Sequence, residues 1–318
     1  MGRLKFRLDY HIGARKNKYI KVPVEVRVEV TDRCNLACDF CFKENSQKEP
    51  SLEQVKKVID NVSCSGVKAI RFTGGEPFMR TDLKEILGYA KEKGLYTIVN
   101  SNGTLIKDCD FLDNIDSVLI SFHEHKKRIA GLLDMLTKHN IVVRVSTILT
   151  KKNIDELDIF YKTAKNLDLN EWFFLRPVHN IKQLVSKEDM KTAIRKIVRY
   201  NKEYGRGCFI ANSVPFCIFE PEEMGLADAV VVGGRNDSGN TRLVVSSDGS
   251  IKTDYYSKMV LGNAFEDSLS DVWKHFNGYP VPKGCAQCNY LAKCLSGISI
   301  WNHEGLYSTN DPLLKGKI

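Results

Sequence analysis

The chain has 318 residues, of which 43% are hydrophobic and 27% charged, and its formal net charge is +8. This apolar fraction can build a sizeable core, which excludes a disordered or collagen-like chain. No apolar run reaches about 18 residues, and Met1 to Asp9 lack the apolar stretch of a secretory signal, so we expect a cytoplasmic protein without a membrane partner. The basic charge weakly favours anionic partners, and no basic stripe interleaved with aromatic residues indicates nucleic-acid binding.

Strands and helices are predicted to alternate from residue 22 to residue 205. Valine at every second position of Val22–Val30 predicts a strand, and Ser51 with Gln54 predicts a capping box at the start of a helix. The further predicted strands are Ala69–Phe72, Tyr96–Ser101, Ser117–Phe122, Ile141–Thr147 and Glu171–Leu175. The further predicted helices are Thr81–Lys93, Lys126–His139, Asn153–Leu167 and Ser186–Tyr204.

Six strand–helix units predict parallel strands with right-handed crossovers. Eight units would close a TIM barrel, so the expected fold is α/β, a partial (β/α)6 TIM-like barrel with a small C-terminal α+β cysteine-rich extension. The expected domains are an N-terminal extension at 1–21, the barrel at 22–205 and the cysteine-rich extension at 206–318. Within the last, Gly205 to Gly239 is expected to be loop-rich, and Thr241–Ser246 with Ser250–Tyr255 to form a hairpin.

Six of the ten cysteines lie in two tight clusters, which in a long chain outside the secretory route indicates metal ligands rather than disulfides. Cys34, Cys38 and Cys41 follow the first predicted strand with the spacing C-x3-C-x2-C. A loop of this spacing can wrap three thiolates around an iron–sulfur cubane, which normally takes four cysteines. One iron would then keep an open position, as a catalytic metal does. A zinc site completed by His11 or another cysteine is the alternative.

The cysteine triplet, with Phe40 before its last member, resembles the signature of the radical SAM superfamily. Thr73–Pro77 after the second strand is similar to the family's GGEP motif, and Asn100–Gly103 resembles its third-strand segment. Glycines there allow close approach of the backbone, and a carboxylate with carbonyls can accept bonds from an ammonium group. The resemblance implies that S-adenosylmethionine is bound by Gly74, Gly75, Glu76, Pro77, Asn100, Asn102, Ser121 and Arg144.

The resemblance also implies a mechanism. The amino and carboxylate groups of S-adenosylmethionine chelate the open iron of a [4Fe–4S] cluster, and one electron cleaves the sulfonium bond. The resulting 5′-deoxyadenosyl radical abstracts a hydrogen from a substrate C–H bond. An electron donor such as flavodoxin or ferredoxin is implied as a partner. Family members often carry Ser-x-Asp-Gly after strand four, whereas this chain carries His123 and His125 there. His123 is therefore a candidate catalytic residue, as a substrate contact or proton relay, with a solvated helix start as the alternative.

The second cluster, Cys285, Cys288 and Cys294, has the spacing C-x2-C-x5-C. Together with the upstream segment Val244–Ile251 it resembles the SPASM extension or its shorter twitch form, which bind auxiliary iron–sulfur clusters. Asp254 and Ile298 stand where the full extension has cysteines, so one auxiliary cluster with a fourth ligand from elsewhere is implied.

Cys217 is the preferred fourth ligand, ahead of Cys208, because Pro215 and Phe216 can fix its direction. The alternatives are a structural zinc knuckle and, for either cysteine, a catalytic role as a thiol hydrogen donor. Of the remaining cysteines, Cys64 and Cys109 are expected to be core residues.

Radical SAM proteins with such extensions commonly modify ribosomally made peptides, protein residues or carbohydrates. The expected function is therefore peptide (RiPP-type) or protein modification by a radical SAM oxidoreductase or maturase. A dehydrogenase or epimerase acting on a carbohydrate or small-molecule natural product is the alternative. A non-catalytic iron–sulfur electron carrier or redox sensor is the alternative from another class, although such a carrier has no need of a three-cysteine site or a glycine–glutamate loop.

Overall fold

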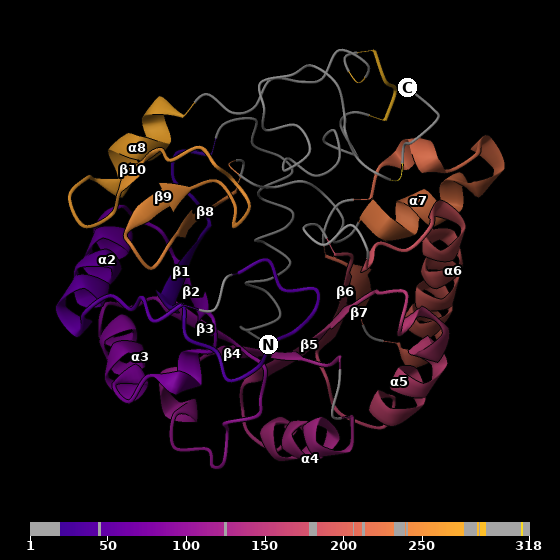
Figure 1. The fold of residues 1–318 in the computed structure, drawn as a ribbon, viewed down its shortest axis with the longest axis horizontal. Helices are drawn as coiled ribbons and strands as arrows, with labels where there is room; N and C mark the ends of the chain where they lie inside the picture. Colours follow the sequence, from indigo (N-terminus) through magenta and orange to yellow (C-terminus); the bar gives the residue numbers. More distant parts are fainter. Residues whose placement is uncertain are drawn as a thin grey trace. The chain divides into compact units, whose positions relative to one another are not determined.

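The computed structural model describes residues 20–43, 46–123, 126–177, 183–205, 207–211, 214–231, 239, 241–276, 285, 287–290 and 313. The contacts within the chain define two units, whose elements are labelled in Figure 1. The first unit holds the described residues of Met1–Leu36, Lys43–Val118 and Asp237–Gly278. The second holds those of Ala37–Phe42, Leu119–Asn236 and Tyr279–Ile318.

The strands of the first unit follow the order β10-β9-β8-β1-β2-β3. Their bounds are β1 (Glu25–Thr31), β2 (Ala69–Gly74), β3 (Tyr96–Ser101), β8 (Arg242–Val245), β9 (Ser250–Lys252) and β10 (Gly262–Asn263). Strand β1 pairs in parallel with β2 and with β8, and β2 pairs in parallel with β3. The predicted hairpin is confirmed, since β9 runs antiparallel to β8. The parallel pairing of β8 with β1 joins segments more than 200 residues apart, which no local pattern predicts.

The helices of the first unit are α2 (Leu52–Cys64), α3 (Leu83–Glu92) and α8 (Leu269–His275), with short 3-10 turns η1 (Pro77–Met79) and η2 (Leu112–Asn114). The capping box of α2 is confirmed: the Ser51 hydroxyl accepts from the Gln54 N–H, and the Gln54 side chain accepts from the Ser51 N–H. The inward stripe of α2, made of Val55, Val58, Ile59 and Val62, is buried. The Asn61 amide of α2 donates to the Asp267 carbonyl and accepts from the Leu269 N–H, which binds α2 to the start of α8.

The chain enters the second unit within β4 (Ser117–Ser121). There, β5 (Val142–Ile148), β6 (Glu171–Leu175) and β7 (Gly207–Ile210) pair in parallel. The helices are α4 (Lys126–Thr137), α5 (Leu157–Ala164), α6 (Lys187–Tyr204) and α7 (Met224–Val231), with 3-10 turns η3 (Ile154–Glu156), η5 (Phe216–Ile218) and η6 (Pro221–Glu223). Trp172 packs against the rings of Phe122 and Phe174, and its indole N–H donates to the Thr147 hydroxyl.

The α/β class of a partial TIM-like barrel is confirmed, and the six predicted strands are β1 to β6. Helices alternate with them except between β3 and β4, where the chain forms only η2. The segment from Gly205 to Gly239 is less loop-rich than predicted, since it contains β7 and α7. Strand β7 has only four residues, too few for a clear strand pattern in the sequence. Its place in the sheet is fixed by its pairing with β6. The boundary near residue 205 and the cysteine-rich extension stay predictions. Within the described part of the chain, no helix is both long and apolar enough to cross a membrane.

Candidate functional site

The loop after β1 carries the first cysteine cluster. Cys34 and Cys38 are partly buried, Cys41 is exposed, and all three are thiols rather than disulfides. The Cys41 N–H donates to the Cys38 carbonyl at 3.0 Å, which closes a turn over the intervening pair of residues. Thiols on one loop are the donor set that an iron–sulfur cubane takes. No three Cys, His, Asp or Glu side chains in the described residues gather around one metal ion, but a cubane carries its thiolates on separate irons. The donor chemistry therefore fits a cluster.

Gly74, the last residue of β2, and Gly75 after it leave no room for a Cβ beside the backbone of the cysteine loop. A Cβ on Gly75 would lie 2.1 Å from the Arg33 carbonyl oxygen, and a Cβ on Gly74, at φ 142°, would lie 2.1 Å from that of Thr31. The Gly75 N–H donates to Thr31 O at 2.7 Å, and the Glu76 N–H donates to Arg33 O at 2.8 Å. The glycine loop and the start of the cysteine loop are therefore held together by main-chain hydrogen bonds. The sequence predicts that glycine there admits a ligand, whereas the close approach in the structure is to the protein's own backbone.

Glu76 joins the glycine loop to the end of β3. Its side chain is 1% exposed, and its carboxylate accepts from the Ser101 hydroxyl at 2.8 Å, the Asn102 N–H at 2.7 Å and the Phe78 N–H at 3.1 Å. Burial raises the pKa of the Glu76 carboxyl above its ordinary value, and the hydrogen bonds that the carboxylate accepts offset this only in part. Pro77 begins η1, for which Glu76 is the N-cap. Glu76 thus holds two loops in register through donors of the protein itself.

The two predicted amides, Asn100 in β3 and Asn102 just after it, have different partners. The Asn100 Oδ1 accepts from Arg71 at 2.9 Å, and Arg71 forms a two-point ion pair with Glu25 of β1. Burial opposes the charge on Glu25, but Arg71 and Arg27 outweigh it and hold its pKa far below the usual range. Asn102 instead lies beside the cysteine loop, with its amide nitrogen 2.9 Å from Asn35 Oδ1. We did not predict the buried charged network around Arg71 from the sequence. The charged residues that alternate with valine in β1 could have indicated it.

The predicted site residues of the second unit lie at different ends of their strands: Ser121 at the carboxyl end of β4 and Arg144 near the amino end of β5. Ser121 is the last residue of β4, and His123 lies two residues further along the chain, after the buried Phe122. The His123 Nδ1 accepts from the Ile148 N–H at 2.9 Å, at the end of β5, and its ring contacts the Phe40 ring edge-on at 4.9 Å. Burial lowers the pKa of His123 to about 4. Arg144 lies near the start of β5, where its guanidinium pairs with Glu171 of β6 at 2.9 Å.

The second cysteine cluster repeats the turn seen in the first. The Cys288 N–H donates to the Cys285 carbonyl at 3.0 Å, as Cys41 does to Cys38. The Phe216 ring, next in sequence to Cys217, lies 6.2 Å from the Tyr290 ring, so η5 lies beside the segment that holds this turn. Cys294, Ile298 and His11 lie outside the described residues.

The remaining cysteines differ in exposure. Cys217 is exposed, whereas Cys208 is buried in β7, where burial raises the pKa of its thiol to about 12. Cys64 is exposed, contrary to prediction. The inward stripe of α2 ends at Val62, and two residues further the helix has turned by about 200°. Cys109 is partly buried, and burial, Asp108 and Asp110 raise the pKa of its thiol.

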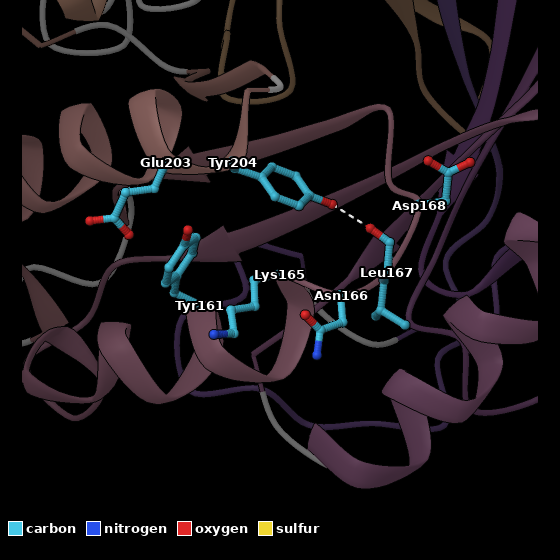
Figure 2. Close-up of a pocket in the computed structure, with 7 residues that line it drawn as sticks. All are labelled: Tyr161, Lys165, Asn166, Leu167, Asp168, Glu203 and Tyr204. Carbon is cyan, nitrogen blue, oxygen red and sulfur yellow. Dashed lines mark hydrogen bonds between the residues drawn. The ribbon is translucent and has the colours of Figure 1, made fainter.

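A cavity of about 420 Å³ lies in the second unit, beside the end of α5 and the end of α6 (Figure 2). The Tyr204 hydroxyl donates to the Leu167 carbonyl across it at 2.5 Å. The residues lining it are Tyr161, Lys165, Asn166, Leu167, Asp168, Glu203 and Tyr204. Several of them precede β6, so the cavity lies at the amino end of that strand. Chemistry in parallel α/β folds gathers at the carboxyl ends, and the cavity includes none of the predicted site residues.

Comparisons with known proteins point to one family. Residues 28–160 match the family model described as the radical SAM superfamily. Fe-coproporphyrin III synthase of Methanosarcina barkeri is 25% identical over 86% of this chain and 82% of that protein. A probable GTP 3',8-cyclase of Saccharolobus islandicus is 26% identical over 78% of this chain and 85% of that protein.

The solved structures give the same fold. Streptococcus suis SuiB bound to S-adenosylmethionine has a TM-score of 0.71 at 17% identity, covering 93% of this chain and 78% of that one. SuiB bound to precursor peptide SuiA has a TM-score of 0.69 at 16% identity, covering 93% of this chain and 76% of that one. The cysteine triplet and the glycine loop both fall within the region that matches the family. Residues 28–160 of this chain therefore resemble a radical SAM domain.

Proposed function

We propose that this protein is a radical SAM enzyme that holds a [4Fe–4S] cluster on Cys34, Cys38 and Cys41 and binds S-adenosylmethionine next to it. Together the two cofactors supply reductive cleavage of the sulfonium bond and abstraction of a hydrogen from a substrate C–H bond. The observation that carries the proposal is the hydrogen-bonded assembly of cysteine loop, glycine loop and β3 end through Gly75 and Glu76.

The protein's own part is to position these loops. Asp32 and Lys43 pair at 2.6 Å, one on each side of the cysteine triplet, so the two ends of the loop are joined. The carbonyls of the glycine loop, together with Asn100 and Ser121, are proposed to contact S-adenosylmethionine. Arg144 is proposed to contact S-adenosylmethionine as well. Its guanidinium would then have to bind the cofactor while it remains paired with Glu171. A flavodoxin or ferredoxin is the proposed electron donor.

Cofactor cleavage is the direct test. The full chain is reconstituted without oxygen and given dithionite and S-adenosylmethionine, and 5′-deoxyadenosine is measured. We expect cleavage by the wild type, and its loss when Cys34, Cys38 and Cys41 are all replaced by Ala. Cys64→Ala is the matched control, because Cys64 is exposed on α2 and should leave cleavage unchanged. A wild type with a full cluster but no cleavage would support the electron-carrier alternative.

For the substrate we propose a peptide or protein side chain. The support is the similarity in fold to SuiB, which has been solved with its precursor peptide. A second candidate is a carboxylate-bearing tetrapyrrole, favoured by the similarity in sequence to Fe-coproporphyrin III synthase and by the net charge of +8, which favours anionic partners.

The two substrate classes are separated by the same cleavage reaction. A short peptide encoded beside this gene and Fe-coproporphyrin III are each offered to the reduced enzyme, in deuterated and ordinary form. We expect deuterium in 5′-deoxyadenosine only from the deuterated peptide. Transfer of deuterium from the tetrapyrrole instead would overturn the peptide assignment and leave the radical SAM assignment intact.

We propose in addition that Cys285, Cys288 and Cys294 hold an auxiliary cluster with Cys217 as fourth ligand, within a SPASM- or twitch-like region at 206–318. Two observations support Cys217 over Cys208. The Phe216–Tyr290 contact brings η5 to the Cys285–Cys288 turn, and burial of Cys208 disfavours the thiolate that a metal requires. Because Cys217 is exposed, the alternative that it is a thiol hydrogen donor stays open.

A further inference from the structure

We propose that the side-chain amide of Asn102 donates a hydrogen bond to the Cys34 thiolate and thereby raises the reduction potential of the cluster. The inference rests on the proposed function, because Cys34 matters here as a cluster ligand. The potential of an iron–sulfur cluster depends on hydrogen bonds to its sulfurs and on the groups around its ligands.

The amide nitrogen of Asn102 faces two acceptors in the cysteine loop. It lies 2.9 Å from Asn35 Oδ1 and 4.0 Å from Cys34 Sγ. An amide nitrogen carries two N–H groups, so one serves Asn35 and the other is available to the sulfur. Hydrogen bonds to sulfur are long because the sulfur atom is large.

The orientation of this amide is fixed by Thr104. The Asn102 Oδ1 accepts from the Thr104 N–H at 2.8 Å and from the Thr104 hydroxyl at 2.6 Å. A backbone N–H can only donate, so the oxygen must face Thr104 and the nitrogen must face Asn35 and Cys34. The Asn35 amide in turn donates to the Thr104 hydroxyl at 2.8 Å, which closes a ring of hydrogen bonds among the three side chains. Such rings strengthen each member bond.

The backbone beneath the ring is fixed as well. The Asn102 N–H donates to the buried carboxylate of Glu76, and the neighbouring Ser101 hydroxyl donates to the same group. The Glu76 N–H is bonded to the Arg33 carbonyl, one residue before Cys34. Glu76 therefore holds both the donor and the chain that carries the acceptor, so the amide and the sulfur keep their positions relative to each other.

The sign of the effect follows from charge. Reduction adds an electron whose charge is spread onto the sulfur ligands, and an N–H dipole aimed at a sulfur stabilises the reduced state more than the oxidised state. Loss of the donor should therefore lower the reduction potential. A carboxylate in its place should lower it further, because the donor is replaced by a negative charge.

The test is a redox titration of the reconstituted full chain, monitored by electron paramagnetic resonance. The signal to monitor is the one that changes when S-adenosylmethionine is added, because it belongs to the cluster that binds this cofactor. The variants are Asn102→Ala, Asn102→Asp and Thr104→Val, the last of which leaves the amide in place but breaks the ring. At the wild-type midpoint we expect the ratio of reduced to oxidised cluster to fall several-fold in Asn102→Ala and most in Asn102→Asp. The fall should be smaller in Thr104→Val, which loses the hydroxyl bonds of the ring but keeps the backbone N–H that holds the amide oxygen. Each tenfold fall corresponds to about 59 mV.

The control is Asn114→Asp, which makes the same charge change in η2, where the amide lies beside Gly88 of α3. It should keep the wild-type ratio. Equal midpoints in the wild type and the Asn102 and Thr104 variants, at full iron content, would overturn the inference and leave the proposed function standing. Should Asn102→Ala lose iron, Thr104→Val and Asn102→Asp decide the matter. A wild type that binds no cluster would remove the proposed function and this inference together.

Discussion

His123 is a histidine whose surroundings restrict its chemistry. Its Nδ1 accepts from the Ile148 N–H, and burial lowers its pKa to about 4, so at neutral pH the ring is uncharged with its proton on Nε2. The one nitrogen that could take up a proton is therefore engaged with the backbone. A role as a general base is disfavoured while that bond persists. The sequence prediction that His123 contacts a substrate stays a prediction, and in that role the neutral ring would offer its Nε2–H as a donor.

The pH dependence of unfolding tests this state of His123. An unfolded histidine titrates near 6.5, so between about pH 6.5 and pH 4 the unfolded chain binds a proton that the folded chain does not. Folding stability contributed by the neutral ring is thus present above pH 6.5 and is lost as the pH falls. We expect His123→Asn, whose Oδ1 can still accept from Ile148, to lose less thermal stability between pH 7 and pH 5 than the wild type, both measured without cluster.

His139→Gln is the control for that comparison. His139 is exposed between α4 and β5, and its replacement should keep the pH dependence of the wild type. If His123→Asn and the wild type lose the same stability between the two pH values, the lowered pKa of His123 is wrong.

At the scale of elements, the cysteine loop is joined at its base by an ion pair. Lys43 pairs with Asp32 at 2.6 Å and with Glu29 of β1 at 2.9 Å, and all three side chains are largely buried. Burial opposes the charge on Lys43, but Glu29 and Asp32 outweigh it and raise its pKa. The Asp32 N–H also donates to the Lys48 carbonyl, beyond the loop. These contacts shorten the segment that is left to move around a cluster.

Two asparagine substitutions in this loop should therefore differ. Asp32→Asn leaves Lys43 with one carboxylate and should destabilise the fold by about 1–3 kcal/mol. Asp39→Asn removes an exposed pair with Lys152, and such pairs contribute about 0–1 kcal/mol. We expect iron to leave Asp32→Asn several-fold faster than wild type in the presence of a chelator, and Asp39→Asn to match the wild type. Equal release from both variants would show that the base of the loop does not depend on the ion pair.

The elements that the sequence predicted are those with local patterns. Strand β1 shows valine at every second residue and α2 shows a capping box with an apolar stripe, so each could be predicted within a short window. Strand β7 and the pairing of β8 with β1 depend on residues far away in the chain, which no window contains. The site followed the same rule. The cysteine and glycine loops could be located from their residue types and spacing, but the role of Glu76 as a clamp between loops is a property of their packing.

At the scale of the whole molecule, the ten cysteines divide by environment as much as by spacing. The spacing predicted two ligand clusters and left Cys208 and Cys217 undecided. Their surroundings distinguish them: Cys208 lies in β7 with its thiol pKa raised to about 12, whereas Cys217 is exposed in η5 beside the segment of Cys285 and Cys288. A metal binds thiolates, so the buried thiol is the poorer ligand.

Iron content provides the test of that assignment. In the variant with Cys34, Cys38 and Cys41 replaced by Ala, we expect about four irons per chain, one cubane's worth. Adding Cys217→Ser should reduce that number well below four and make the remaining iron labile to a chelator, because one of four ligands is lost. Adding Cys208→Ser should leave the iron content unchanged, although a hydroxyl in the core of β7 lowers the melting temperature. Zinc in place of iron would exclude the auxiliary cluster. Full iron without Cys217 would assign the fourth ligand to another residue and leave Cys217 available as a hydrogen donor.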